Sequence, residues 1–239
     1  IEKFGITVDG ASADYILRDE MYLYKAPEGL DIKHLCLSEP VAVAAHLLEK
    51  VRKAVPSGFA DKRVLVLGGG VIGMSALMLL LHMENCRQAE LYDLAESRTA
   101  LARGEGARIP AAQELAPSSE GGDYASLYAA AKYDVVIETT GVASVFANAL
   151  NLVKPGGVLG CVGMIAKVEI AQKLIVTKSL TVIGSIGGTG DFPRAMEFLC
   201  KNPASADKLI SHYYPIGEAA QAFATARVPE GTMKVVLTL

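Results

Sequence analysis

Apolar residues from position 62 onward fall into short continuous runs that alternate with helical patterns. The clearest run, residues 64–67 (VLVL), is typical of a strand that is covered on both faces. Six strands separated by helical segments predict an α/β fold, a doubly wound parallel (Rossmann) sheet in the order 3-2-1-4-5-6. The further strands are expected over 89–92, 107–109, 134–138, 158–162 and 180–185, and the helices over 71–84, 95–103 and 143–152.

The other parts of the chain are patterned less regularly. Residues 6–28 carry tyrosines and aliphatic residues between turn signals, so strands are expected there. Asp31 is expected to cap a helix that ends at Leu37, and Pro40 to open a second helix over 41–54. The remaining expectations are Gly104 as the residue just after a helix, a loop over 110–123, a turn over 154–157 (KPGG), helices over 124–131, 194–200 and 217–226, and a last strand over 233–239.

Composition narrows the class of protein. The net charge of −3 and the lack of any basic run argue against nucleic acid and against a polybasic membrane anchor. The longest apolar stretch, residues 71–81, is shorter than the roughly 20 residues of a membrane span, and the N-terminus does not read as a signal peptide. Four dispersed cysteines indicate neither a zinc ribbon nor a disulfide framework. We therefore expect a cytoplasmic protein whose cysteines are small buried hydrophobic residues.

The central motif is a glycine-rich turn, G-x-G-x-x-G over residues 68–73, placed between the VLVL run and an apolar helix. Gly68 permits the tight turn, Gly70 lets the backbone approach a pyrophosphate, and Gly73 lets the helix pack closely on the strand. Val71 and Ile72 begin the helix, whose N-terminus offers free N–H groups to phosphates. Three adjacent glycines also occur in flexible turns, so the motif alone does not decide the function.

An acidic residue strengthens the interpretation as a dinucleotide site. Asp93 ends the next predicted strand, twenty residues after Gly73, where a carboxylate accepts hydrogen bonds from the adenosine ribose. The same charge repels the 2′-phosphate of NADP, which favours NAD. Arg98, one helical turn further on, is either an adenine contact or a solvated helix residue.

Three later strand ends are expected to border the cofactor, because ligands of open α/β sheets bind at the carboxyl ends of the strands. The segment 184–188, after the last strand of the sheet, is placed near the nicotinamide. The residues assigned to these loops are Thr140 and Gly141, Val162 and Gly163, and Ser185 and Ile186.

Several motifs together resemble the zinc-dependent medium-chain dehydrogenases, and the pair Glu39–Pro40 looks most like their sorbitol (polyol) dehydrogenase branch. The resemblance covers nearly the whole chain. It rests on SEPVAVAAH (38–46), VLVLGGGVIG (64–73), YDLAESR (92–98), VIETTG ending at Gly141, KPGG (154–157), VIGSIG (182–187), ISHYYP (210–215) and MKVVL (233–237).

The resemblance implies a Rossmann domain over 45–188, flanked by remnants of a GroES-like catalytic domain at 1–44 and 189–239. It implies NAD as cofactor, a small alcohol or polyol as substrate, and a homodimer or homotetramer, which the apolar strand over 180–185 would suit. It also implies a catalytic zinc that polarises the substrate hydroxyl, with Glu39 at the metal position.

The other zinc ligands of that family lie upstream of the first residue, and the chain begins with Ile rather than Met. We therefore expect an N-terminal catalytic part to be missing and the catalytic residues to be unidentified. One glutamate does not hold zinc by itself, because a catalytic site usually has three protein ligands.

Local replacements for the missing ligands are not favoured. His34, Cys36 and Glu39 diverge on a helix, so we expect His34 at the surface and Cys36 buried, and we interpret His46 as a core histidine. The alternatives are a zinc-free quinone or enone reductase of the same superfamily, which would prefer NADPH, and a non-catalytic NAD-binding module.

Overall fold

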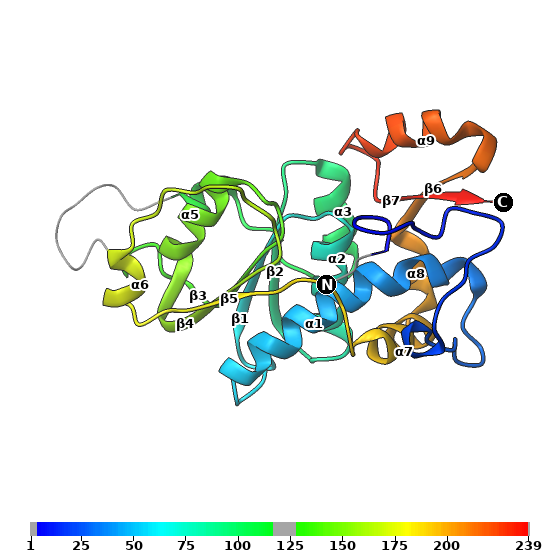
Figure 1. Ribbon diagram of the computed structural model, residues 1–239. Coiled ribbons are helices and arrows are strands. Elements are labelled where there is room, and N and C mark those ends of the chain that lie inside the picture. Colours follow the sequence, from blue (N-terminus) through cyan, green and yellow to red (C-terminus); the bar gives the residue numbers. More distant parts are fainter. Residues whose placement is uncertain (1–3, 117–127, 239) are drawn as a thin grey trace.

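The computed structural model describes residues 4–116 and 128–238, and its centre is a twisted parallel sheet (Figure 1). The strand order is β2-β1-β3-β4-β5, and an isolated parallel bridge between Glu90 and Arg108 adds a short sixth strand outside β2. Counting that bridge, the order matches the predicted 3-2-1-4-5-6 arrangement. The strands are β1 (Arg63–Leu67), β2 (Gln88–Tyr92), β3 (Tyr133–Glu138), β4 (Val153–Cys161) and β5 (Thr181–Gly184).

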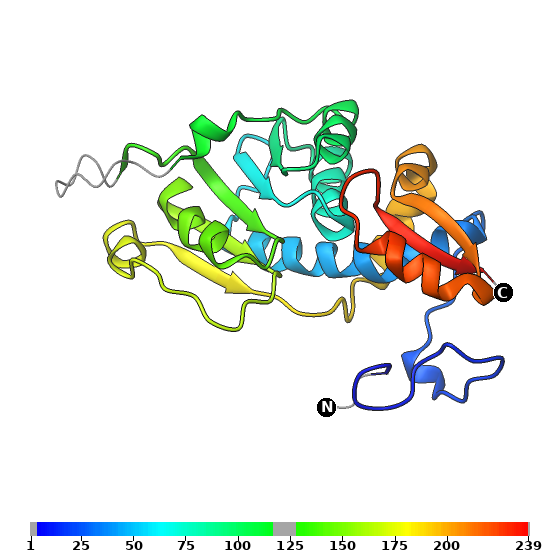
Figure 2. The same ribbon diagram turned by 90° about the horizontal axis from the view of Figure 1, so that it is seen from above.

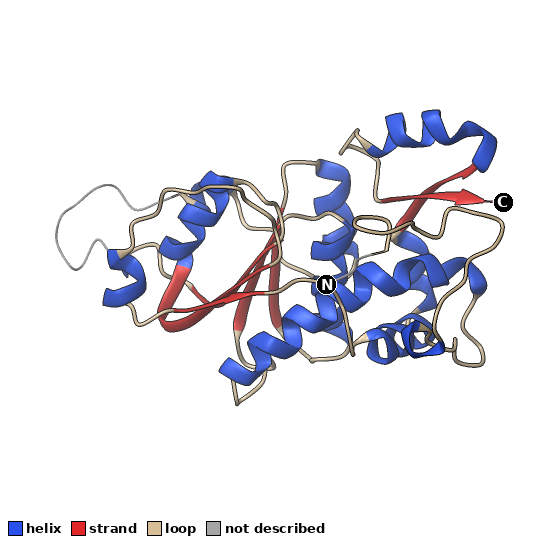
Figure 3. Cartoon of the chain, in the orientation of Figure 1, coloured by secondary structure: helices blue, strands red, loops and turns tan. Residues whose placement is uncertain are grey.

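Helices cover both faces of this sheet, which explains the continuous apolar run of β1. Val64 and Val66 belong to a core formed with α1, α2 and α7, whereas Leu65 and Leu67 belong to a second core formed with α5 and α6. Figure 3 shows the sheet between these two helical layers. The helices are α1 (Ser38–Ala54), α2 (Val71–His82), α3 (Glu96–Gly104), α5 (Ala143–Leu152), α6 (Lys173–Thr177), α7 (Phe192–Lys201) and α8 (Pro203–Lys208).

Two further parts lie beside the sheet. The C-terminal part pairs β6 (Ile210–Pro215) with β7 (Lys234–Thr238) in parallel, and η4 (Ile216–Glu218) and α9 (Ala219–Ala226) connect them. The N-terminal part carries the short 3-10 helices η1 (Glu20–Tyr22) and η2 (Ile32–Leu37), and most of it projects from the body in Figure 2. A 3-10 helix, η3 (Ala112–Leu115), follows the sixth strand. No helix among the described residues is both long and apolar enough to span a membrane.

Three predictions about local structure are wrong. Residues 6–28 contain no strand apart from one bridge between Phe4 and Val8, and their large apolar side chains are exposed, because no neighbouring strand pairs with them. Gly104 is the last residue of α3 and not the residue after it, and Gly106 takes the left-handed conformation (φ 103°) instead. Residues 154–157 (KPGG), interpreted as a turn, belong to β4.

Other predictions agree with the structure more closely. The helix expected over 143–152 has those limits, and Asp31 caps η2 by accepting a hydrogen bond from the amide of Lys33 at 3.0 Å. The helix expected over 124–131 falls mostly outside the described residues. The sequence interpretation missed α6, α8 and β6, and the expected domain boundary between residues 44 and 45 lies inside α1.

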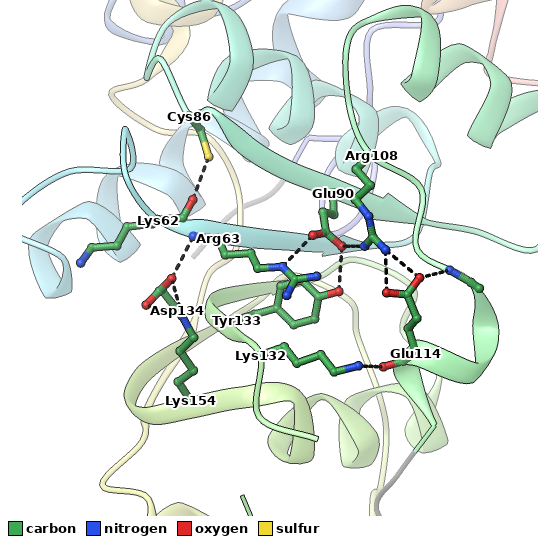
Figure 4. Close-up of polar contacts among 11 residues, drawn as sticks. Lys62, Arg63, Cys86, Glu90, Arg108, Glu114, Lys132, Tyr133, Asp134 and Lys154 are labelled. Carbon is green, nitrogen blue, oxygen red and sulfur yellow. Dashed lines mark hydrogen bonds and ion pairs between the residues drawn. The ribbon is translucent and has the colours of Figure 1, made fainter. Parts of the chain in front are cut away.

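A buried carboxylate on β2 forms hydrogen bonds to side chains at the amino ends of β1 and β3 and to the sixth strand (Figure 4). Glu90 is 3% exposed, and its oxygens accept hydrogen bonds from Arg63 Nε (2.7 Å), Arg108 Nη1 (2.7 Å) and the Tyr133 hydroxyl (2.8 Å). Burial, followed by the bond to Glu90, raises the pKa of Tyr133, so the hydroxyl stays a donor. Arg108 also donates to Glu114, which fixes η3 against the sixth strand.

A buried lysine caps the C-terminus of α5. Lys178 is 1% exposed, and its ammonium donates to the carbonyls of Leu150 (3.1 Å), Asn151 (2.8 Å) and Val153 (3.1 Å). These carbonyls lie at the negative end of the helix and have no partners within it, which suits a cation. Burial lowers the pKa of Lys178 to about 8.

We predict that Glu90→Ala lowers the free energy of unfolding by about 1–3 kcal/mol, because the buried Tyr133 hydroxyl loses its acceptor and two partly exposed guanidinium groups lose a counter-charge. Urea denaturation followed by circular dichroism measures the change. Glu197→Ala, which breaks an exposed pair with Lys201, is the matched control and should leave the midpoint unchanged. Equal midpoints for Glu90→Ala and the control would contradict this role of Glu90.

We predict a pH-dependent stability difference between the protein and Lys178→Met. The pKa of Lys178 is about 8 in the folded state and near its ordinary 10.5 when unfolded, so the unfolded state binds more protons between these values. Its contribution to the free energy of unfolding therefore increases as the pH rises from about 8 to 10.5, by at most about 3 kcal/mol. Denaturation of both proteins at pH 7, 8, 9 and 10 measures this; a constant difference would contradict the lowered pKa.

Candidate functional site

The glycine loop joins the end of β1 directly to α2. Gly68 adopts φ 98°, a left-handed conformation, and its amide donates to the carbonyl of Tyr92 at 2.9 Å. A Cβ on Gly73 would lie 1.9 Å from the carbonyl oxygen of Gly68, so only glycine permits this approach of helix to strand. The roles predicted for these two glycines therefore have direct structural reasons.

The N-terminus of α2 faces open space. Gly70 is its N-cap residue, and a Cβ there would have no atom within 4 Å. The regular hydrogen bonds of the helix begin with the Met74 amide, which donates to Gly70 O at 2.8 Å. The amides of Val71, Ile72 and Gly73 therefore have no carbonyl within the helix to bind, and the positive end of the helix dipole lies beside them. This arrangement suits a phosphate group.

Asp93 stands at the end of β2 beside this loop. Its Oδ2 accepts from the Gly69 amide at 2.7 Å, and its Oδ1 accepts from the Ala95 amide at 2.8 Å. Each carboxylate oxygen can accept a second hydrogen bond, so the group is oriented while it keeps capacity for a ribose diol. The side chain is 12% exposed.

Arg98 makes only long contacts beside Asp93. Its Nη1 is 3.4 Å from Asp93 Oδ2, its Nη2 is 3.5 Å from the carbonyl of Thr232, and its buried Nε has no partner. The turn before β7 also contacts the start of α3. The Glu230 carboxylate accepts a hydrogen bond from the Ser97 amide (3.0 Å), and the Gly231 amide donates to Ser97 Oγ (3.0 Å). The C-terminal part thus contacts α3 next to Asp93, which sequence reasoning missed because these residues are more than 130 positions apart.

Glu138 organises the ends of β3 and β4. The side chain is fully buried, and Oε1 accepts from the amides of Thr140 (2.7 Å) and Gly141 (3.0 Å) and from the Thr140 hydroxyl. Its Oε2 has no partner, and a Cβ on Gly163 would lie 2.5 Å from that oxygen. Burial, and next the Glu138 charge, raises the pKa of the Cys161 thiol. Glu138 was not among the predicted site residues.

The remaining predicted residues follow β4 and β5. The amide of Val162 donates to Glu138 O at 3.0 Å, and the amide of Ser185 donates to Cys161 O at 2.9 Å. Ser185 Oγ is buried without a partner, whereas Ile186 is 64% exposed. All the predicted cofactor residues therefore lie after the carboxyl ends of β1 to β5, either in the loops or in the first turns of the helices α2 and α3 that follow them.

The described residues do not form a metal site. No group of three or more His, Cys, Asp or Glu side chains in that part of the chain is arranged to hold a metal ion. Glu39 is exposed in the first turn of α1. The histidines have other partners: His34 Nε2 lies 2.8 Å from Asp207, His46 Nδ1 2.7 Å from Asp191, His82 Nε2 2.9 Å from Glu105, and His212 Nδ1 2.9 Å from Ser211.

Two expectations about these side chains are wrong. His34 is buried, at 1% exposure, and Asp207 of α8 provides a partner for its imidazole. Cys36 is only half-buried. The cysteines are all free thiols, yet only Cys86 is buried; burial raises its pKa to about 11. His46, interpreted as a core histidine, has a hydrogen-bond partner in Asp191, but its side chain is only partly buried, at 26% exposure.

Comparison with protein families matches residues 32–239 to the family described as the glucose dehydrogenase C-terminus. Among curated proteins, sorbitol dehydrogenase of Bos taurus is 26% identical over 236 residues, which cover 96% of the chain and 63% of the relative. The chain spans less than two thirds of the length of the first curated relatives that it matches. The predicted resemblance to polyol dehydrogenases is confirmed.

Solved structures share the fold over almost the whole chain. One, described as a short chain alcohol dehydrogenase of Escherichia coli CFT073 in complex with NADH, has a TM-score of 0.84 at 22% identity and covers 99% of this chain and 68% of its own. Another, assigned as a zinc-binding dehydrogenase of Sinorhizobium meliloti 1021 and bound to NADP, has a TM-score of 0.76 at 27% identity and covers 98% and 68%. The predicted Rossmann fold is confirmed.

We predict that an added methyl group lowers the stability at one glycine of the loop and leaves it unchanged at another. Gly73→Ala should lower the free energy of unfolding by more than about 2 kcal/mol, since its Cβ overlaps Gly68 O. Gly70→Ala should unfold at the parent's urea concentration, because its Cβ meets open space. Equal stability of the two variants would contradict the close approach of α2 to β1.

Proposed function

Because the chain belongs to the family of the glucose dehydrogenase C-terminus, we propose that it is the cofactor-binding part of an NAD-dependent alcohol or polyol dehydrogenase. One observation carries the proposal: the glycine loop, the open N-terminus of α2 and the Asp93 carboxylate lie at the ends of the neighbouring strands β1 and β2. A dinucleotide needs a phosphate cradle and a ribose acceptor in this relation.

Each end of the cofactor has its own residues in this proposal. The amides of the loop from Gly68 to Gly73 hold the pyrophosphate, Asp93 accepts the adenosine ribose hydroxyls, and Arg98 packs beside the adenine. The nicotinamide, which accepts hydride from the alcohol carbon, lies toward the ends of β3 to β5. The proposed residues there are Thr140, Gly141, Val162, Gly163, Ser185 and Ile186.

Asp93 favours NAD over NADP. The carboxylate is held in place by hydrogen bonds from the Gly69 and Ala95 amides. Rotation away from a 2′-phosphate would break these hydrogen bonds. Two negative charges about 4 Å apart repel each other strongly in a partly buried site. The NADP bound to the Sinorhizobium neighbour makes this preference worth measuring directly.

The substrate is proposed to be a secondary alcohol or polyol, as the names of the curated relatives indicate. Glu39 is placed at the metal position by resemblance alone. It is a single exposed carboxylate, and the described residues do not supply the other ligands of a catalytic zinc. We therefore derive no step through the metal from this chain.

A second candidate function is NAD binding without catalysis. The same lack of a metal-binding group among the described residues favours it. The test is the oxidation of sorbitol and simple secondary alcohols by the protein encoded by the whole gene, with added zinc. NAD-linked turnover supports the dehydrogenase, and cofactor binding without turnover supports the binding module.

We predict that the chain binds NADH at least tenfold more tightly than NADPH. Asp93→Asn should reduce this ratio to less than threefold, because it removes the charge and keeps an amide oxygen for one backbone hydrogen bond. Fluorescence titration with both nucleotides measures the dissociation constants. Glu96→Gln, which removes a charge three residues further on in the first turn of α3, is the charge-matched control and should keep the parent ratio. Tighter binding of NADPH by the parent would contradict the assignment and support a reductase of the enone type.

A further inference from the structure

One face of α1 holds the loop between β5 and α7. Ala42, His46 and Lys50 are spaced by four residues, so they lie along one side of the helix. Each contacts a different position of the segment 184–191, which contains Ser185 and Ile186. The loop is thus fastened at three points to a single rigid helix.

The first and last of these contacts involve the backbone of the loop. A Cβ on Gly188 would lie 2.6 Å from the Cβ of Ala42, so the loop backbone rests directly on α1. At the other end, the ammonium of Lys50 donates to the carbonyl of Gly184 at 3.1 Å. Neither contact fixes the orientation of a side chain in the loop.

The middle contact joins two side chains. His46 Nδ1 lies 2.7 Å from Asp191 Oδ2, and the exposed fractions of the two side chains are 26% and 16%. Asp191 begins α7, and its amide donates to Gly188 O at 3.0 Å, which closes the turn. The pair therefore fixes the point where the loop becomes a helix.

The loop needs such an anchor because its own residues constrain it weakly. Gly187 and Gly190 adopt φ 69° and 91°, and Gly188 has no side chain to pack. Glycine has the greatest backbone freedom of any residue, so a segment of this composition depends on external contacts for its conformation.

We infer that His46 is a positioning residue for the nicotinamide end of the cofactor site. By holding Asp191, it sets the conformation of the loop that carries Ser185 and Ile186, and it acts through that loop without contact with the cofactor. The inference rests on the proposed function and extends it, since it divides the site into an adenosine end fixed by Asp93 and a nicotinamide end fixed by α1.

The test compares two probes on the 239-residue chain. NADH occupies both ends of the proposed site, whereas ADP-ribose keeps the adenosine, the pyrophosphate and the second ribose and lacks only the nicotinamide ring. His46→Leu should weaken NADH binding at least threefold and leave the dissociation constant of ADP-ribose within 1.5-fold of the parent. His46→Asn, whose amide can reach Asp191 in place of the imidazole Nδ1, should restore most of the NADH affinity.

His82→Leu is the matched control, because His82 also pairs with a carboxylate, Glu105, and is similarly exposed at 30%. It should change neither constant. If His46→Leu weakens both probes by the same factor, or neither, the inference is overturned. If the parent binds neither NADH nor ADP-ribose, the proposed function fails first, so the two failures are distinguishable.

Discussion

The close approach of α2 to the end of β1 is the constraint on which the candidate site depends. Without a side chain at Gly73, the first turn of α2 lies against the Gly68 carbonyl, and its free amides face open space directly beyond the strand. The same turn places the Gly69 amide on Asp93. The proposed phosphate cradle and the proposed ribose acceptor therefore both depend on this one packing contact.

Buried polar groups have protein partners at one end of the sheet and lack some of them at the other end. Near the amino ends, Glu90 satisfies its oxygens with two guanidinium groups and a hydroxyl, so the charges compensate one another inside the protein. Among the described residues, four buried side-chain polar atoms have no protein partner, and three of them, Arg98 Nε, Glu138 Oε2 and Ser185 Oγ, follow the carboxyl ends of the strands; the fourth, Ser38 Oγ, lies at the start of α1. Unpaired buried polar atoms cost free energy, and their concentration at one edge is what a polar ligand site would show.

Sequence patterns predicted the sheet and the glycine loop well, because both depend on local rules. VLVL is buried on both faces, and the residues of the G-x-G-x-x-G motif have the geometry that the motif implies. The patterns failed where a partner far along the chain decides the outcome. His34 is buried, with its imidazole hydrogen-bonded to Asp207. The tyrosines and leucines of residues 6–28 remain exposed, because no strand pairs with this segment. Glu138 could have been noticed as a carboxylate that directly follows the apolar residues 135–137 at the end of β3.

The turn before β7 has a consequence for how this chain can be divided. Glu230 accepts a hydrogen bond from the amide of Ser97 in the first turn of α3, and the Gly231 amide donates to Ser97 Oγ, so residues near the C-terminus contact the adenosine side of the proposed site. A continuous segment that contains the complete proposed cofactor site therefore has to extend as far as Gly231. A dissection that stops after β5 would retain every residue of the glycine motif and still expose the N-terminus of α3 to solvent.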